Sequence, residues 1–220
     1  MRVLFVLMLL TSLVLLAPPL QMAAAATPEL DRAVLDYESG RLELARSRFE
    51  VLARRGVPAA KFNLAVMHLR GEIPKPDLVQ AQALLTQAAQ GGFITAQFML
   101  AQALETGRFG KPDLQAAQPW YERAASGGSS DAQVAMGTAH YLGRGARKDP
   151  AEAARWFGLA ARAGDVGAQY LLASMYEQGD GVALDLKLAR YWYDIAARNG
   201  DDAAPSKVKE IDAKLAQSPG

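Results

Sequence analysis

The chain has 220 residues, a formal net charge of +1 and no cysteine. This length allows one domain of ordinary size or one stack of repeats, with enough apolar residues to bury a core. The lack of cysteine excludes disulfides and a lipid-anchored lipoprotein, and the near-zero charge argues against a nucleic-acid partner.

Residues 1–26 have the pattern of a secretory signal peptide. Arg2 supplies the positive start, residues 3–16 are apolar, and residues 24–26 are the small alanines that a signal peptidase needs. The alternative is an uncleaved membrane anchor, but two prolines interrupt the apolar run, which is shorter than the roughly 20 residues needed to cross a bilayer. We predict cleavage before Thr27, export to the periplasm or beyond, and no stable membrane insertion afterwards.

Residues 27–58 are predicted to form a helix pair that caps the N-terminal end of the chain. Five positions align with the repeat described below after the loss of five loop residues: Tyr37, Gly40, Ala45, Phe49 and Ala53. The pair is rich in arginine, and these cations are interspersed with Glu43 and Glu50. The arginines are Arg41, Arg46, Arg48, Arg54 and Arg55. A solvated charged surface is the ordinary interpretation, and a contact surface for anionic envelope components is the alternative.

Four segments of 36 residues then align without a gap, and we assign them to 59–94, 95–130, 131–166 and 167–202. Each has a leading alanine as its second residue: Ala60, Ala96, Ala132 and Ala168. The first half of each segment ends in glycine, at Gly71, Gly107, Gly143 and Gly179. Because glycine supplies the left-handed residue after a helix, each segment is predicted to hold two antiparallel helices.

An aspartate opens the second half of every segment, at Asp77, Asp113, Asp149 and Asp185. Its side chain can accept hydrogen bonds from the free N–H groups of the first helical turn. Gln80 and Glu152 follow three residues later in two segments, which predicts a reciprocal capping box there. Ile73 and Phe109 replace the second turn glycine of the last two segments, so the first two turns should differ in shape. Residues 203–220 are predicted to add one closing helix.

This pattern resembles the Sel1-like repeat family, whose members are related to the tetratricopeptide repeat. The last segment matches best, with Leu172, Tyr176, the Gly179-x-Gly181-Val182 turn and Trp192. The resemblance implies an all-α fold, a right-handed superhelix of antiparallel helix pairs. It also implies a protein-binding scaffold rather than an enzyme.

The sequence offers little for catalysis. Without cysteine, histidine chemistry would depend on His68 and His140, which occupy the same repeat position as Tyr176 and lie two repeats apart. At that separation they cannot share a metal ion, and we interpret both as packing substitutes for tyrosine. The glycine turns lack the strand and the Lys-Ser/Thr of a phosphate-binding loop. We therefore predict no enzyme activity, no metal and no cofactor.

The resemblance places the first helix of each pair on the concave face and maps a candidate partner-binding set onto it. These nine residues are Phe62, Leu69, Arg70, Phe98, Glu105, Val134, Tyr141, Tyr170 and Glu177. Rigid rings beside polar groups suit an extended peptide or a partner helix. The equally weighted alternative is that the rings pack between helices.

The predicted function is an exported adaptor that holds a protein or peptide in assembly or regulation of a cell-envelope system. One alternative is a cell-wall hydrolase or small-ligand binder, which would need a deep polar pocket with convergent ionisable groups. Another is a secreted virulence factor that binds host proteins. The subgroup of the family associated with hydrolase or antibiotic-binding activity has repeats linked by cysteines, which this chain lacks.

Overall fold

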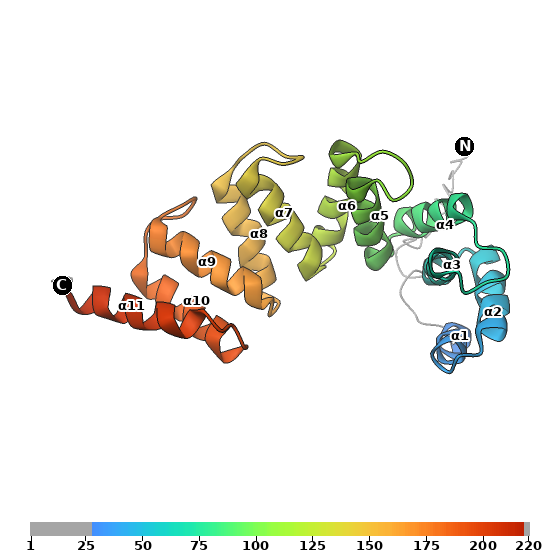
Figure 1. Ribbon diagram of the computed structural model, residues 1–220, viewed down its shortest axis with the longest axis horizontal. Helices are drawn as coiled ribbons and strands as arrows, with labels where there is room; N and C mark the ends of the chain where they lie inside the picture. The colour runs from blue at the N-terminus through green and yellow to red at the C-terminus, as the bar shows by residue number, and fades with distance from the viewer. Residues whose placement is uncertain (1–27, 218–220) are drawn as a thin grey trace, which may run out of the picture.

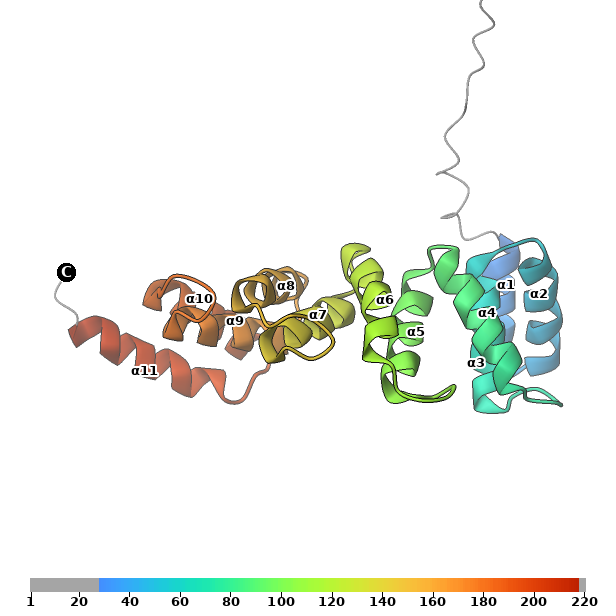
Figure 2. The same ribbon diagram turned by 90° about the horizontal axis from the view of Figure 1, so that it is seen from above.

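The computed structural model describes residues 28–217, and the predicted signal peptide lies outside this range. The described chain forms eleven helices and no strand, arranged as a curved row with α1 and α11 at opposite ends (Figures 1 and 2). The helices are α1 Pro28–Glu38, α2 Leu42–Arg54, α3 Pro58–Arg70, α4 Leu78–Gln90, α5 Ile94–Thr106, α6 Leu114–Ser126, α7 Ser130–Leu142, α8 Pro150–Arg162, α9 Val166–Gln178, α10 Leu186–Arg198 and α11 Ala204–Gln217. The predicted all-α solenoid of helix pairs is confirmed.

The second helix of each repeat begins where the sequence pattern places an aspartate. The carboxylates of Asp113, Asp149 and Asp185 each accept a hydrogen bond from the N–H group three residues later, at 2.9–3.1 Å. That of Asp77 accepts from both Val79 and Gln80. These bonds satisfy amides that a helix start leaves free, so they fix the point at which α4, α6, α8 and α10 begin.

The predicted capping box at Asp149 is wrong in its second half. The Glu152 carboxylate binds Arg155 at 2.7 Å instead of returning to the Asp149 amide. That amide is already used, because it donates to the His140 carbonyl across the interhelical turn at 2.9 Å. At Asp77 the backbone amide likewise donates to the His68 ring, at 3.1 Å.

Glycine ends the first helix of each repeat because the chain turns there with a positive φ. Gly179, for example, has φ +69° and donates its amide to the Met175 carbonyl. The second turn glycines Gly145 and Gly181 also have positive φ, whereas no described residue other than glycine does. Ile73 and Phe109 therefore cannot reproduce that conformation, and the first two turns do differ from the last two.

Small residues allow neighbouring helices to approach closely. The leading alanines Ala60, Ala96, Ala132 and Ala168 are fully buried, as are Ala81, Ala153 and Ala189 on the second helices. At Gly137 a methyl group would come within 2.7 Å of the Phe157 ring, so only glycine fits between α7 and α8 as they stand. The core is consequently a line of small clusters between consecutive helices rather than one central mass.

Successive repeats are also joined by a buried glutamine that the sequence analysis missed. Gln97, Gln133 and Gln169 directly follow three of the leading alanines and are 2–8% exposed. Each side-chain amide donates to a carbonyl in the last turns of the preceding repeat, Ala89, Ala125 or Ala161, at 3.1 Å. Because the bond crosses from one repeat to the next, it sets how the two repeats sit together.

The closing helix α11 continues the repeat period. Its Ala204 lies 36 residues after Ala168, is fully buried as Ala168 is, and occupies the same position of the repeat. Ile211 is also fully buried, against α9 and α10 residues such as Tyr193. Helix α11 thus corresponds to the first helix of a further repeat. No helix among residues 28–217 is long and apolar enough to span a bilayer.

Candidate functional site

A hollow lies across the first two repeats, and we call it the inter-repeat groove. It has a volume of about 630 Å³. Helices α3 and α5 supply most of its wall, with one residue each from α1, α4 and α6. The lining residues are Tyr37, Phe62, Asn63, Val66, Leu69, Arg70, Leu85, Met99, Gln102, Ala103, Glu105, Thr106, Arg108 and Tyr121.

Four of the nine predicted site residues, Phe62, Leu69, Arg70 and Glu105, come together in this groove. The Arg70 guanidinium donates to the Tyr37 hydroxyl at 2.8 Å, and that hydroxyl donates to Glu72 at 2.7 Å. Tyr37 was aligned with the repeat in the sequence but not assigned to the site. It reaches the groove from α1 and contacts Arg70 at the end of α3.

The other five predicted residues do not line this groove: Phe98 lies on α5, and the other four lie farther along the solenoid, on α7 and α9. Tyr141 is 37% exposed, and its hydrogen bond to Asp180 raises the pKa of the phenol. Val134 is half-buried against the core cluster around Phe157. That the nine residues form one partner-binding face stays a prediction.

The aromatic residues two positions after the leading alanines have mixed surroundings. Phe98 and Tyr170 are half-buried and make edge contacts with Tyr121 and Tyr193, with ring centroids 5.8 and 5.1 Å apart. Phe62 lies 5.1 Å from Phe93 and also lines the groove. Each of these rings therefore packs within its own or the adjoining repeat, and Phe62 in addition offers surface to the groove.

A smaller pocket of about 190 Å³ adjoins the groove at the boundary of the second and third repeats, and we call it the Glu105 pocket. It shares Glu105 and Tyr121 with the groove. Its remaining lining residues are Leu114, Gln118, Ala135, Thr138, Ala139 and Arg144. Glu105 thus lines two adjoining hollows.

The Glu105 carboxylate is held in place by one strong hydrogen bond. The buried Tyr121 hydroxyl donates to its Oε2 atom at 2.6 Å. Burial and this carboxylate together raise the pKa of Tyr121 far above its ordinary value, so the phenol stays protonated and remains a donor. Glu105 was predicted from the sequence as a site residue, whereas its tyrosine partner on the neighbouring helix was not.

Glu177 has the same arrangement in the fourth repeat, where Tyr193 donates to Oε2 at 2.9 Å. Here Lys214 of α11 also donates to Oε1 at 2.6 Å, and Lys207 lies 3.4 Å from Oε2. Burial alone would raise the pKa of Glu177, but the bonds from Lys214 and Tyr193 and the two ammonium charges lower it overall.

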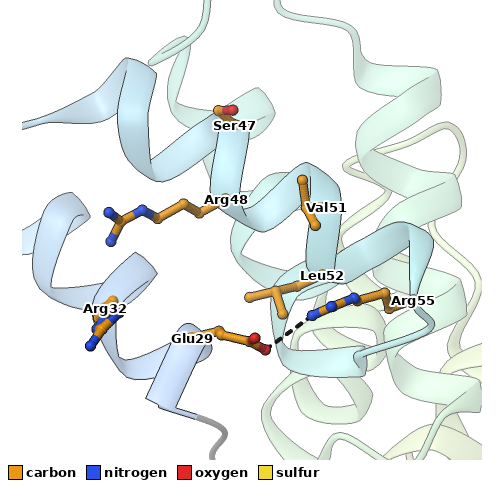
Figure 3. Close-up of a pocket in the computed structure, with 7 residues that line it drawn as sticks. All are labelled: Glu29, Arg32, Ser47, Arg48, Val51, Leu52 and Arg55. Atoms are coloured by element: carbon orange, nitrogen blue, oxygen red, sulfur yellow. Dashed lines mark hydrogen bonds and ion pairs between the residues drawn. The ribbon is translucent and has the colours of Figure 1, made fainter.

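The arginine-rich N-terminal pair contains a shallow pocket of about 330 Å³ between α1 and α2 (Figure 3). Arg32, Arg48 and Arg55 line it, and Arg55 is paired with Glu29 at 3.0 Å. Arg48 and Arg41 both bind the nearly buried Asp36 carboxylate, at 2.8 and 2.7 Å. Several of these arginines therefore hold the pair together, in addition to any role as a charged surface.

Both histidines take part in the interhelical turns. The His68 ring accepts the Asp77 amide, and burial lowers the pKa of His68 although the nearby Asp77 charge opposes this. His140 Nδ1 lies 3.2 Å from the Arg147 carbonyl. Among residues 28–217 no group of three or more potential ligand side chains is placed to hold a metal ion.

The stacked helix pairs and their side grooves define an α-solenoid of the kind that binds proteins. The Sel1 repeat profile matches residues 58–93, 94–129, 130–165 and 166–201, which together make up well over half of the chain. The chain therefore belongs to the Sel1 repeat family, whose members are generally protein-interaction scaffolds and typically not catalytic.

Three solved structures illustrate the similarity. A Sel1 repeat protein from Oxalobacter formigenes is 33% identical with a TM-score of 0.71, and the match covers 76% of this chain and 49% of that one. The c5321 protective antigen of uropathogenic Escherichia coli is 28% identical with a TM-score of 0.75, covering 83% and 40%. A Klebsiella pneumoniae protein described as a putative Sel1 repeat protein is 22% identical with a TM-score of 0.50, covering 84% and 91%. The chain thus spans less than half the length of the first two. Comparison with curated protein sequences gives no match.

Proposed function

We propose that this chain is a scaffold that holds a segment of a partner protein in the inter-repeat groove. The observation that carries the proposal is the composition of this 630 Å³ hollow. Phe62, Val66, Leu69 and Met99 supply apolar surface, and arginine and glutamate side chains line the same hollow. Apolar anchors surrounded by polar groups are typical of peptide-binding grooves, because the anchors supply affinity and the polar groups fix the register.

Capture of the partner by a variant with an altered groove tests this proposal. Val66→Glu combined with Arg108→Glu would place two carboxylates in the groove, at a half-buried and an exposed position. Partner recovery from an envelope extract, quantified by mass spectrometry, should fall by about tenfold or more, as expected when a binding site loses a central apolar contact and gains unpaired charge.

Arg162→Glu is the matched control, because Arg162 is exposed at the end of α8 and lines neither hollow. Circular dichroism melts of both variants must match that of the wild type. Equal recovery of the same partner by the wild type and the groove variant would refute the proposal.

We further propose that the protein acts in the periplasm, in the assembly or regulation of a cell-envelope system. The support is the signal-peptide pattern of residues 1–26, which lie outside the described residues. Cell fractionation should recover the protein in the periplasmic fraction, and N-terminal sequencing should find Thr27 as the first residue. A chain that retains Arg2, or one found only in the cytoplasm, would contradict this proposal.

A further inference from the structure

Glu105 and Glu177 are the same residue of the repeat, nine positions after Ala96 and Ala168. In both repeats a tyrosine sixteen residues later donates its hydroxyl to Oε2, at 2.6 and 2.9 Å. The first and third repeats have Leu69 and Tyr141 at this position. The acidic site therefore occurs twice, with the same hydroxyl partner each time.

The two sites differ in what covers the carboxylate. At Glu177 the two lysines of α11 complete the site, and the glutamate side chain is only 8% exposed. Helix α11 follows the repeat period, so its equivalent next to Glu105 is α7. There Ala135 and Leu142 take the positions of Lys207 and Lys214, each 72 residues earlier in the chain.

No ammonium group consequently reaches Glu105 from the described chain, where Glu105 forms no ion pair. The Glu105 pocket lies beside Ala135, at the position where Lys207 reaches Glu177 in the fourth repeat. Arg144 lines the same pocket but forms no ion pair with Glu105. The pocket therefore presents an oriented carboxylate that no cationic side chain of the described residues pairs with.

The orientation of the carboxylate favours an ammonium over a guanidinium. Tyr121 already donates to Oε2, so Oε1 is the oxygen for which the described residues provide no hydrogen-bond donor. Lys214 uses Oε1 of Glu177 in this way. An ammonium is a point charge that needs one accessible oxygen, whereas a guanidinium makes its strongest contact with both oxygens at once.

We propose that Glu105 is the receptor for a lysine side chain of the partner segment, in the way that Glu177 receives the lysines of α11. This inference rests on the proposed function, since it names the partner chemistry that the groove selects. The adjoining apolar wall at Phe62, Val66 and Met99 calls for apolar residues beside that lysine. The partner is therefore a protein segment with a lysine next to apolar side chains.

Selection of short random peptides on the purified protein tests the inference. We expect binders that share a lysine flanked by apolar residues. Replacing that lysine with norleucine, which keeps the chain length and removes the charge, should weaken binding by about tenfold or more. Glu105→Gln should cause the same loss, and the two changes together should cost no more than either one, because both remove one interaction.

Three further variants complete the design. Glu122→Gln removes an equal charge from an exposed position of α6 and should leave binding unchanged. Ala135→Lys places an ammonium at the position of Lys207. This lysine should pair with Glu105 within the protein and so weaken binding of the lysine peptide by about tenfold or more. Ala135→Gln is its uncharged counterpart and should have a smaller effect. The norleucine peptide and the Ala135→Lys variant therefore test the inference even where Glu105→Gln impairs folding.

The outcomes separate the two proposals. Selected peptides without a lysine preference, or with equal affinity for wild type and both Glu105→Gln and Ala135→Lys, would overturn the lysine receptor while leaving the groove as a binding site. Peptides that bind equally to the Val66→Glu and Arg108→Glu variant would overturn the groove itself. Failure to select any peptide on the wild type would count against both.

Discussion

Single residues carry the contacts between repeats, and the buried glutamines illustrate this. Gln169 is 2% exposed, donates to the Ala161 carbonyl and accepts from the Asn199 side chain at 3.0 Å. Gln169→Ala removes both of these buried hydrogen bonds, so we expect a loss of about 1–3 kcal/mol in the free energy of unfolding. Urea titration would measure it, with the exposed Gln115→Ala as the control expected to change stability little.

The contribution of the single residue Glu177 to the free energy of unfolding should depend on pH. Its pKa is lowered in the folded chain, so its contribution to stability is present above the unfolded pKa of about 4.3 and is lost as the pH falls through the folded value. Glu177→Gln should cost about 1–3 kcal/mol at neutral pH and progressively less under acidic conditions. Urea titrations across this range would test it. An equal cost at every pH would contradict the predicted linkage, and Glu122→Gln provides the exposed comparison.

The sequence could name some of these residues but not their partners. Glu105 and Glu177 followed from fixed offsets within the repeat, and their tyrosines were visible as residues of the second helix. The hydrogen bond between them depends on how the two helices rotate about their axes, which the period alone does not specify. The glutamines recur every 36 residues, but the period alone does not show that a polar residue beside a leading alanine is buried, since its burial follows from the stacking of repeats.

At the scale of the element, the helices follow from local chemistry. The glycines at the ends of first helices and the aspartates at the starts of second helices located these boundaries from sequence, because each supplies a conformation or a hydrogen bond that a helix end requires. First helices begin one residue before the predicted segments, as at Pro58 and Ile94. The capping box failed for a nonlocal reason, since the turn had already engaged the Asp149 amide.

Helix packing predicts opposite changes in stability when two buried glycines are replaced by alanine. Gly137→Ala would place a methyl group 2.7 Å from the Phe157 ring between α7 and α8, so we expect a loss of about 1–3 kcal/mol. Gly158→Ala, within α8, meets only ordinary contacts of 3.5 Å or more. It should stabilise the helix by about 0.5–1 kcal/mol because alanine loses less backbone entropy. Thermal melts of the two variants should therefore shift in opposite directions, and a parallel shift would contradict this account.

The whole molecule behaves as a one-dimensional stack, because its extensive helix packing joins neighbours in sequence, from α1 with α2 through α10 with α11. Such an array is stabilised by each unit and by its nearest interfaces. The effect of a lost contact should therefore decay along the row seen in Figure 1. This arrangement also explains why binding chemistry can differ from one repeat to the next, as it does at Glu105 and Glu177, without disturbing the fold.

One substitution near each end of the row of helices tests whether the effect of a lost contact decays along it. Ile211→Ala removes a fully buried side chain from α11 and should cost about 2–5 kcal/mol locally. We expect faster amide hydrogen exchange in α9, α10 and α11 and unchanged exchange in α1 to α4, because no extensive contact joins these regions. Leu52→Ala, at a 3% exposed position of α2, should have the opposite effect, with faster exchange in α1 to α4 and unchanged exchange in α9, α10 and α11. Uniform acceleration along the chain in both variants would instead indicate one cooperative unit, in which the repeats cannot respond separately to a partner.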